Sequence, residues 1–271
     1  MYSRSQFTNA WFFARHPVFT TDEFAAANQH TKRESKHSLL AYNRRSGRLI
    51  NIRRGLYAVV PDGMTAESYI VNPYLVAAKA TADAVIAYHS ALSFQGYAYS
   101  QFNTVTYLTA QKETQKFDFQ GSEYVGVTQP RALLRKRTSD FGIEEADQMG
   151  MSVRVTSVER TLVDCFDRLD LAGGIEEVWR SLQLVPQLRM REINEYARLL
   201  GNSITTAKVG VFLQFNKDHF RVKDDDLELL RKRRPANKSY MVPGDRGGKL
   251  ISDWNLVVPR YVVDKGWEEP M

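Results

Sequence analysis

The spacing of apolar positions at the start of the chain predicts three short helices. Residues 20–28 (TTDEFAAAN) and 31–47 (TKRESKHSLLAYNRRSG) each begin with a threonine three residues before a glutamate, which is the capping-box pattern of a helix start. Gly47 stands where the second of these helices needs a left-handed residue to end. Residues 6–15 form a further predicted helix, and Pro17 ends it.

The pattern then changes to that of strands. RLINI (48–52) and LYAVV (56–60) are alternating or continuously apolar, contain β-branched and aromatic residues, and are separated by RRG, so we expect a hairpin. Three helices followed by a basic hairpin predict a winged helix-turn-helix domain in residues 1–62. In such a domain the second helix of the helix-turn-helix enters the DNA major groove.

Helix geometry divides residues 31–47 into two faces, because successive side chains are about 100° apart. We expect the outward face to carry Arg33, His37, Ala41 and Arg44. The opposite, apolar face would carry Leu39 and Tyr42, with Leu40 at its margin. Asn43 stands near this apolar face, where leucine or valine would be expected.

The basic side chains of this domain receive different predicted roles from their positions. Arg33 and Lys36 are the candidates for contact with or near bases, because they lie at the start of the second helix. Arg53 and Arg54 at the hairpin turn would meet phosphates or the minor groove. The complete predicted DNA-binding set is Lys32, Arg33, Lys36, His37, Arg44, Arg45, Arg48, Arg53 and Arg54, with Arg44, Arg45 and Arg48 assigned to the DNA backbone.

Positive charge is concentrated in this same segment. The protein has 271 residues and a formal net charge of +6. Residues 1–60 hold ten lysines and arginines against three acidic residues, a local charge of +7, whereas the rest of the chain holds 27 basic and 28 acidic residues. Such asymmetry is typical of a nucleic-acid-binding segment attached to a nearly neutral body.

Residues 63–271 predict a larger body in which helices and strands are mixed. Residues 73–96 have the sequence pattern of helices. Segments with the pattern of strands follow, such as FNTVTYLTA and MSVRVTSV, and then several segments that predict amphipathic helices. The last part, residues 239–259, reads as another hairpin or pair of short strands. Because the two kinds of element do not alternate regularly, the fold class is α+β.

A search of the body for catalytic patterns finds little. It has no P-loop, no G-x-G-x-x-G, no H-E-x-x-H and no nucleophile elbow. Asp164 and Asp167 lie one helical turn apart and have the spacing of a metal site, but surface ion pairs with Arg160 and Arg168 explain the same residues. His89 is expected to be a packing residue. We therefore expect no cofactor and no metal.

Three further features limit the interpretation. The basic run at 231–234 (RKRR) follows an acidic helix start and is either its basic end or a second nucleic-acid or partner surface. Cys165 is the single cysteine and fits a reducing compartment as a small core residue on a helix. No stretch of about 18 apolar residues and no export signal occur, so we expect a cytoplasmic protein without a membrane span.

Several segments together resemble a known family. HPVFTTDEFAA, SGRLINIRRGLYAVVP, AYHSALSFQGYA, VTSVERTLVDCFDRLDLAGGIEEVW and WNLVVP are similar to segments of the AbiEi antitoxins, over residues 17–259. Members of that family are partners of AbiEii nucleotidyltransferase toxins in bacterial abortive-infection systems. The resemblance implies a winged helix that binds inverted repeats in its own promoter, and a C-terminal domain needed for antitoxicity, in general without a stable toxin complex.

The sequence thus predicts a sequence-specific DNA-binding autorepressor and antitoxin that is not an enzyme. Two alternatives stay open. In the first, the body is a nucleic-acid-processing enzyme that the winged helix brings to its target, and a metal-dependent cleavage assay would test this. In the second, the body is a protein-interaction module that neutralises the toxin by direct binding, and co-purification would test this.

Overall fold

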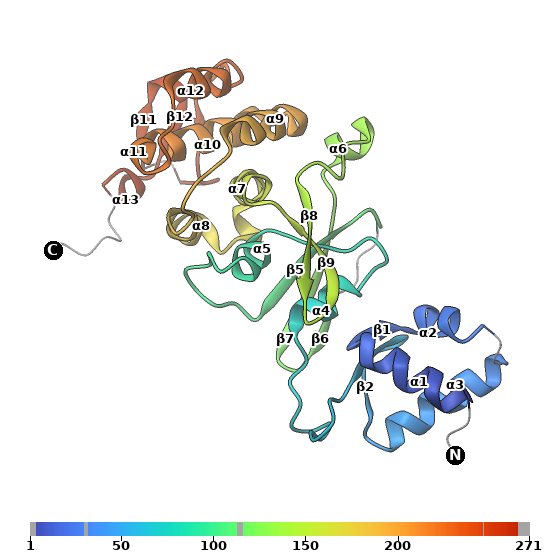
Figure 1. The fold of residues 1–271 in the computed structure, drawn as a ribbon. Coiled ribbons are helices and arrows are strands. Elements are labelled where there is room, and N and C mark those ends of the chain that lie inside the picture. Colours follow the sequence, from blue (N-terminus) through green and yellow to red (C-terminus); the bar gives the residue numbers. More distant parts are fainter. Residues whose placement is uncertain (1–3, 30–31, 113–115, 246, 265–271) are drawn as a thin grey trace.

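The N-terminal part of the protein has the arrangement of a winged helix-turn-helix (Figure 1). The computed structural model describes residues 4–29, 32–112, 116–245 and 247–264. The elements of this part are α1 (Arg4–Arg15), β1 (Val18–Thr20), α2 (Thr21–Ala27), α3 (Arg33–Arg45), β2 (Leu49–Arg53) and β3 (Leu56–Val59). The predicted helices and hairpin are confirmed. Strand β1 is an addition, and it pairs with β3 to give the strand order β1-β3-β2.

The starts of α2 and α3 differ in how they are capped. The Glu23 N–H donates to Thr20 Oγ1 (3.2 Å) and the Thr20 N–H donates to Glu23 Oε2 (2.8 Å), so the first predicted capping box is present. Helix α3 begins at Arg33 with Lys32 at the N-cap, one residue later than the second predicted capping box places it, and the Lys32 side chain makes no capping hydrogen bond. Thr31, to which that cap was assigned, lies outside the described residues.

The three-stranded sheet packs against other side chains on both of its faces. Side chains alternate along a strand, and in β3 Tyr57 and Val59 pack with the phenylalanines of α1 and α2, in a cluster that contains Phe12 and Phe24. The intervening residues of β3 belong instead to a core that continues into the body. The predicted boundary between residues 62 and 63 therefore separates two segments that share one core.

The body is built on a mixed six-stranded sheet of order β6-β7-β5-β4-β9-β8 (Figure 1). Its strands are β4 (Val85–Ile86), β5 (Thr104–Thr109), β6 (Phe117–Phe119), β7 (Ser122–Thr128), β8 (Ile143–Gln148) and β9 (Met151–Thr156). The short β4 lies near the centre, antiparallel to β5 and parallel to β9. The mixture of parallel and antiparallel pairs agrees with the predicted α+β class.

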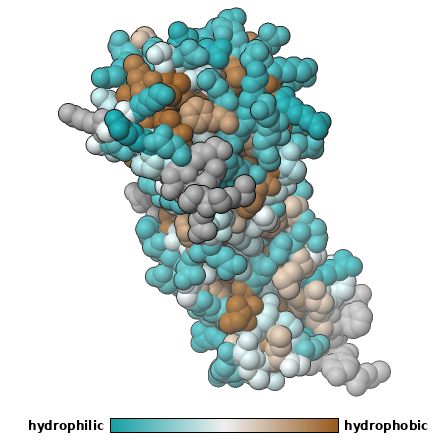
Figure 2. All heavy atoms as spheres, turned by 90° about the vertical axis from the view of Figure 1, so that its left-hand side faces the viewer, coloured by the Kyte–Doolittle hydropathy of each residue, from teal (hydrophilic) through white to brown (hydrophobic). Residues whose placement is uncertain are grey.

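Helices flank the sheet and form a lobe at the end of the body far from the winged helix (Figure 1). They are α4 (Pro73–Ala78), α5 (His89–Phe94), α6 (Arg131–Lys136), α7 (Val158–Asp167), α8 (Gly174–Gln183), α9 (Met190–Leu200), α10 (Ser203–Phe215), α11 (Lys217–Phe220), α12 (Asp224–Arg231) and α13 (Arg260–Val263), with 3-10 turns η1 (Leu169–Leu171) and η2 (Ser252–Trp254). A small sheet completes the lobe, of order β10-β12-β11, with β10 (Ser239–Tyr240), β11 (Lys249–Ile251) and β12 (Leu256–Val258). Figure 2 shows hydrophobic side chains gathered mainly near this lobe, on a face that is otherwise largely hydrophilic.

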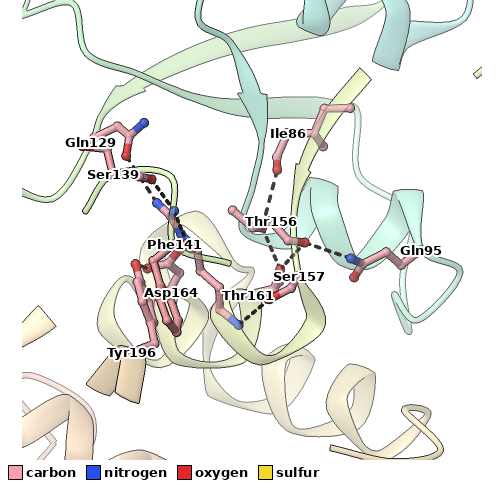
Figure 3. A network of polar contacts seen from close by, with 11 residues as sticks. Ile86, Gln95, Gln129, Ser139, Phe141, Thr156, Ser157, Thr161, Asp164 and Tyr196 are labelled. Carbon is pink, nitrogen blue, oxygen red and sulfur yellow. Dashed lines mark hydrogen bonds and ion pairs between the residues drawn. The ribbon is translucent and has the colours of Figure 1, made fainter. Parts of the chain in front are cut away.

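A buried polar network joins α7 to the rest of the body (Figure 3). Arg160 is 0% exposed, and its Nη1 donates to the carbonyls of Ser139 and Phe141, both at 2.7 Å. Its Nε lies 3.3 Å from Asp164 Oδ2, while Tyr196 donates to Asp164 Oδ1 at 2.6 Å. The expected surface pair of Arg160 with Asp164 is thus a buried one. It fixes the loop before β8 and helix α9 against α7.

The neighbouring acidic residues are engaged as well. Arg168 pairs with Asp170 (2.6 Å) and not with Asp164, which corrects the second expected ion pair. Asp167 Oδ1 accepts hydrogen bonds from Thr205 (2.6 Å) and Asn202 (2.8 Å). Among the described residues, no group of three or more histidine, cysteine, aspartate or glutamate side chains is placed to hold a metal ion.

Cys165 is a buried core residue on α7, as predicted, and its burial raises the pKa of the thiol well above its usual value. Within the described ranges, no helix combines the length and the apolar character needed to cross a membrane.

Candidate nucleic-acid interface

Helix α3 is held against its domain by a face that contains two polar residues. Leu40 and Asn43 are buried, and Lys36 is half-buried. Asn43 Nδ2 donates to the Leu39 carbonyl (2.8 Å), and Lys36 Nζ donates to the Ala25 carbonyl near the end of α2 (3.0 Å). These bonds satisfy polar groups that would otherwise be costly to bury. The inner face of α3 is therefore Lys36, Leu40 and Asn43.

The outward face of α3 is rotated from the predicted one. Tyr42, expected on the apolar face, is 63% exposed, which corrects that assignment, whereas Leu40 is the deeply buried leucine. The centre of the exposed face carries Glu34, Ser38 and Arg45, which lie at positions i, i+4 and i+11. Sequence reasoning missed Ser38 and Tyr42. Treating Asn43 as an inward residue would have predicted the observed inner and outer faces of α3.

The helix also presents cations at both of its ends. Lys32 precedes its first turn, and Arg44 and Arg45 occupy its last turn. All three are exposed, as is His37 on the flank. Within the part of the chain that the structure describes, none of these three cations takes part in an ion pair. A helix of 13 residues is about 20 Å long, so its two ends lie far enough apart to meet phosphates on both sides of the roughly 12 Å wide major groove.

The remaining α3 candidates differ in status. The ammonium group of Lys36 donates a hydrogen bond to the end of α2, a position that does not favour contact with base edges, and its role there stays a prediction. The backbone of Arg33 begins α3, but its side chain lies outside the described part of the structure, and its assignment stays a prediction. Arg48, just after α3, is exposed and its guanidinium lies 5.4 Å from the ring centre of Phe13.

The wing is docked on the body, and this separates its two arginines. Arg53 Nη2 donates to the carbonyl of Ala80, and the guanidinium lies 4.4 Å from the ring centre of Phe117 on β6. This docked position does not favour contact of Arg53 with phosphates or the minor groove, and that role stays a prediction. Arg54 is exposed and makes no ion pair with another described residue. The adjacent Gly55 carbonyl accepts from the Thr21 N–H (2.9 Å), which fixes the turn beside α2.

A second contact ties the helix-turn-helix to the body. The Glu23 carboxylate that caps α2 also pairs with Lys79, the C-cap residue that follows α4. Burial opposes ionisation of Glu23, but hydrogen bonds from Lys79 and Thr20 hold the pKa of its carboxyl below the usual value. The ion pair, the docked wing and the shared core give α3 a defined orientation relative to the sheet of the body.

The basic run at 231–234 begins at the last residue of α12 and continues into the turn after it. Arg231 pairs with Glu228 (3.2 Å), and its guanidinium lies 5.3 Å from the ring centre of Trp254. Arg233 donates to the Leu229 carbonyl (2.7 Å). These contacts agree with the prediction of a basic helix end that follows an acidic start.

Comparison with known proteins identifies a solved structure with a similar fold. No protein-family model matches the chain, and no curated protein matches it. The crystal structure of the RV2827C protein from Mycobacterium tuberculosis is similar over 97% of this chain and 94% of that chain, with a TM-score of 0.62 and 16% sequence identity. The fold is shared. The similarity extends over the winged helix and the α+β body together, so it includes the order of the two parts.

Proposed function

We propose that this protein is a sequence-specific DNA-binding repressor of its own operon and an antitoxin that counters a nucleotidyltransferase toxin. Helix α3 would lie in the major groove with Ser38 and Tyr42 toward the bases. Lys32, Arg44, Arg45 and Arg54 would neutralise phosphates. The chain would act as a regulator and not as an enzyme, with double-stranded DNA as its macromolecular ligand and no cofactor.

The observation that supports DNA binding best is the state of the cations around α3. Cationic side chains that serve only local structure are commonly paired with acids, as Arg189 is with Glu159 at 2.8 Å in the body. Lys32, Arg44 and Arg45 have no such partner among the described residues. Such cations bind phosphates readily, because each contact releases counterions from the duplex.

The test is the salt dependence of binding to the DNA upstream of the gene. Fluorescence anisotropy of a labelled fragment at several salt concentrations gives the slope of log affinity against log salt. Arg44→Ala and Arg45→Ala should each flatten this slope by roughly 0.9, because each removes one phosphate contact. Lys238→Ala, an exposed lysine of the lobe, is the matched control and should leave the slope unchanged. Equal slopes for all four proteins would refute the interface.

The antitoxin part of the proposal is supported by the AbiEi-like segments, which extend through the body. Its test is growth of cells that express the toxin encoded beside this gene, with and without the full chain. Rescue by the Arg44→Ala/Arg45→Ala double variant would show that neutralisation does not need DNA binding. Failure of the full wild-type chain to rescue growth would contradict the antitoxin role, and co-purification would show whether the toxin is contacted directly.

A further inference from the structure

A cavity in the body is separate from the surface assigned to DNA. Its volume is about 250 Å³, and it lies between the β5–β7 pair of the central sheet and the turn that leads into α8. The strands contribute Thr104, Thr106 and Val125 to its lining, and the turn contributes Leu171 and Gly173. Nothing in the proposed repressor role uses this cavity.

The hydroxyl of Thr106 in this lining has no partner among the described protein residues. Thr106 as a residue is only 3% exposed, and its N–H donates to Ser90 Oγ (2.8 Å). Its hydroxyl makes no hydrogen bond within the described structure and is not fully buried, so it is open to the cavity that Thr106 lines. Five other threonines are at least as buried, and each of their hydroxyls is hydrogen-bonded. Thr156 and Thr161 bond to each other, Thr109 and Thr205 bond to Asp83 and Asp167, and Thr206 bonds to the Asn202 carbonyl.

An aromatic pair and a close backbone approach shape the cavity. The rings of Phe102 and His89 are stacked with their centres 3.9 Å apart, and both line the cavity. Burial lowers the pKa of His89, although the hydrogen bond between His89 Nε2 and the accepting Glu177 carboxylate acts to raise it, so burial favours the neutral ring. A Cβ at Gly173 would lie 2.5 Å from the Phe102 ring, and its φ of +79° also favours glycine. Glycine at this position therefore allows Phe102 to lie beside the turn.

The charges at the cavity cancel. Lys116 pairs with Glu123 (3.2 Å), and Asp170 pairs with Arg168 (2.6 Å), so the lining has no excess of positive charge that would favour a free phosphate. The carboxylates of Glu123 and Asp170 are instead suited to accept hydrogen bonds from hydroxyl groups. Carboxylates bind ribose hydroxyls in this way in dinucleotide-binding folds.

We propose that this cavity binds a nucleoside. The flat base would pack against Phe102, Val125 and Leu171, and a donor or acceptor on its edge would satisfy the Thr106 hydroxyl. The ribose hydroxyls would meet Glu123 or Asp170. Mostly apolar walls with a few placed polar groups are typical of small-molecule sites. The site is separate from the DNA interface, so the nucleoside proposal can fail without affecting the proposed function, and the reverse also holds.

Calorimetric titration of the full chain with adenosine, guanosine, cytidine and uridine tests this proposal. At least one nucleoside should bind saturably, and Thr106→Val should weaken that binding at least tenfold, since it removes the hydroxyl and keeps the side-chain shape. Thr106→Ser should restore most of the affinity. Absence of saturable binding by all four nucleosides at millimolar concentration, or binding that is equal in Thr106→Val and wild type, would overturn the proposal.

Thermal unfolding supplies a readout that does not depend on the ligand. Thr106→Val should leave the midpoint unchanged or slightly raised, because its hydroxyl has no partner to lose. Thr206→Val is the matched control, and it should lower the midpoint, because the Thr206 hydroxyl donates to Asn202 at 2.9 Å, while leaving nucleoside binding unchanged. A marked loss of stability in Thr106→Val would show that the hydroxyl is already engaged and would contradict the proposal.

Discussion

Arginines of the winged helix and of the body carry the same charge and have opposite surroundings. Arg44 and Arg45 lie exposed on the last turn of α3, without an acidic partner among the described residues. Arg160 is completely buried and bonded to two carbonyls and a carboxylate. The first group is available to a ligand, whereas the second serves the fold. Charge alone does not tell these two uses apart, but the partners of each guanidinium do.

Arg53 shows that the distinction can fall between neighbours. It belongs to the basic N-terminal segment by sequence, yet its guanidinium is bonded to Ala80 and lies over Phe117, both in the body. Arg54 next to it is exposed. Arg53 ends β2 and Arg54 lies in the hairpin turn, so docking the wing on the body engages one arginine and leaves the other toward solvent.

The largest test of this comparison removes Asp164 from the buried network. Asp164→Ala leaves Arg160 as an unpaired charge in the core, and we expect a loss of roughly 3–5 kcal/mol in the free energy of unfolding. Denaturant unfolding measures this loss. The DNA salt slope of the folded variant should not change. A loss below about 1 kcal/mol would mean that the pair behaves like a surface ion pair.

Replacing the whole pair separates the charge from the packing. In Arg160→Met/Asp164→Leu no charge is left buried, so this double variant should be more stable than Asp164→Ala. If the double variant is the less stable of the two, the carbonyl contacts of Arg160 matter more than its ion pair.

The next test compares Arg53 with Arg54. Arg53→Ala leaves the Ala80 carbonyl without its donor and removes the contact with Phe117, so the free energy of unfolding should fall by about 1–3 kcal/mol. Its DNA salt slope should match the wild type. Arg54→Ala should do the reverse, with little effect on unfolding and a flatter slope. Should both variants flatten the slope equally, the docked wing does not describe the DNA-bound protein.

Local sequence was enough to predict most of the winged helix. The Thr20–Glu23 capping box predicted the start of α2, and the alternation in RLINI and LYAVV predicted β2 and β3. The predicted inward and outward faces of α3 were wrong because the polar residues Asn43 and Lys36 lie on its inner face, where apolar residues are expected. Their hydrogen bonds to backbone carbonyls, which sequence does not show, make that burial possible.

Long-range packing accounts for what sequence missed. Nothing near Arg53 indicates that Ala80 and Phe117 lie beside it, since those residues come 27 and 64 positions later in the chain. Strand β1 has only three residues and depends on pairing with β3. The predicted ion pair of Arg160 with Asp164 followed from helical spacing, but its burial depends on α9, which contributes Tyr196.

The smallest expected effect concerns the ion pair that joins α2 to α4. Lys79 and Glu23 side chains are 22% and 34% exposed, so solvent screens the pair, and Glu23→Gln should cost only on the order of 1 kcal/mol at pH 7. Glutamine keeps one oxygen as the capping-box acceptor, so this variant removes the charge and the acceptor that faces Lys79. Because the folded pKa of Glu23 lies below its unfolded value, the pair stabilises the protein above the unfolded pKa and stops doing so as pH falls through the folded one.

Urea unfolding at pH 7 and near pH 3 tests this pH dependence. The free energies of unfolding of wild type and Glu23→Gln should differ at pH 7, and the difference should be smaller near pH 3. A difference that is independent of pH would mean that Glu23 acts through its hydrogen bonds with Thr20 and not through its charge.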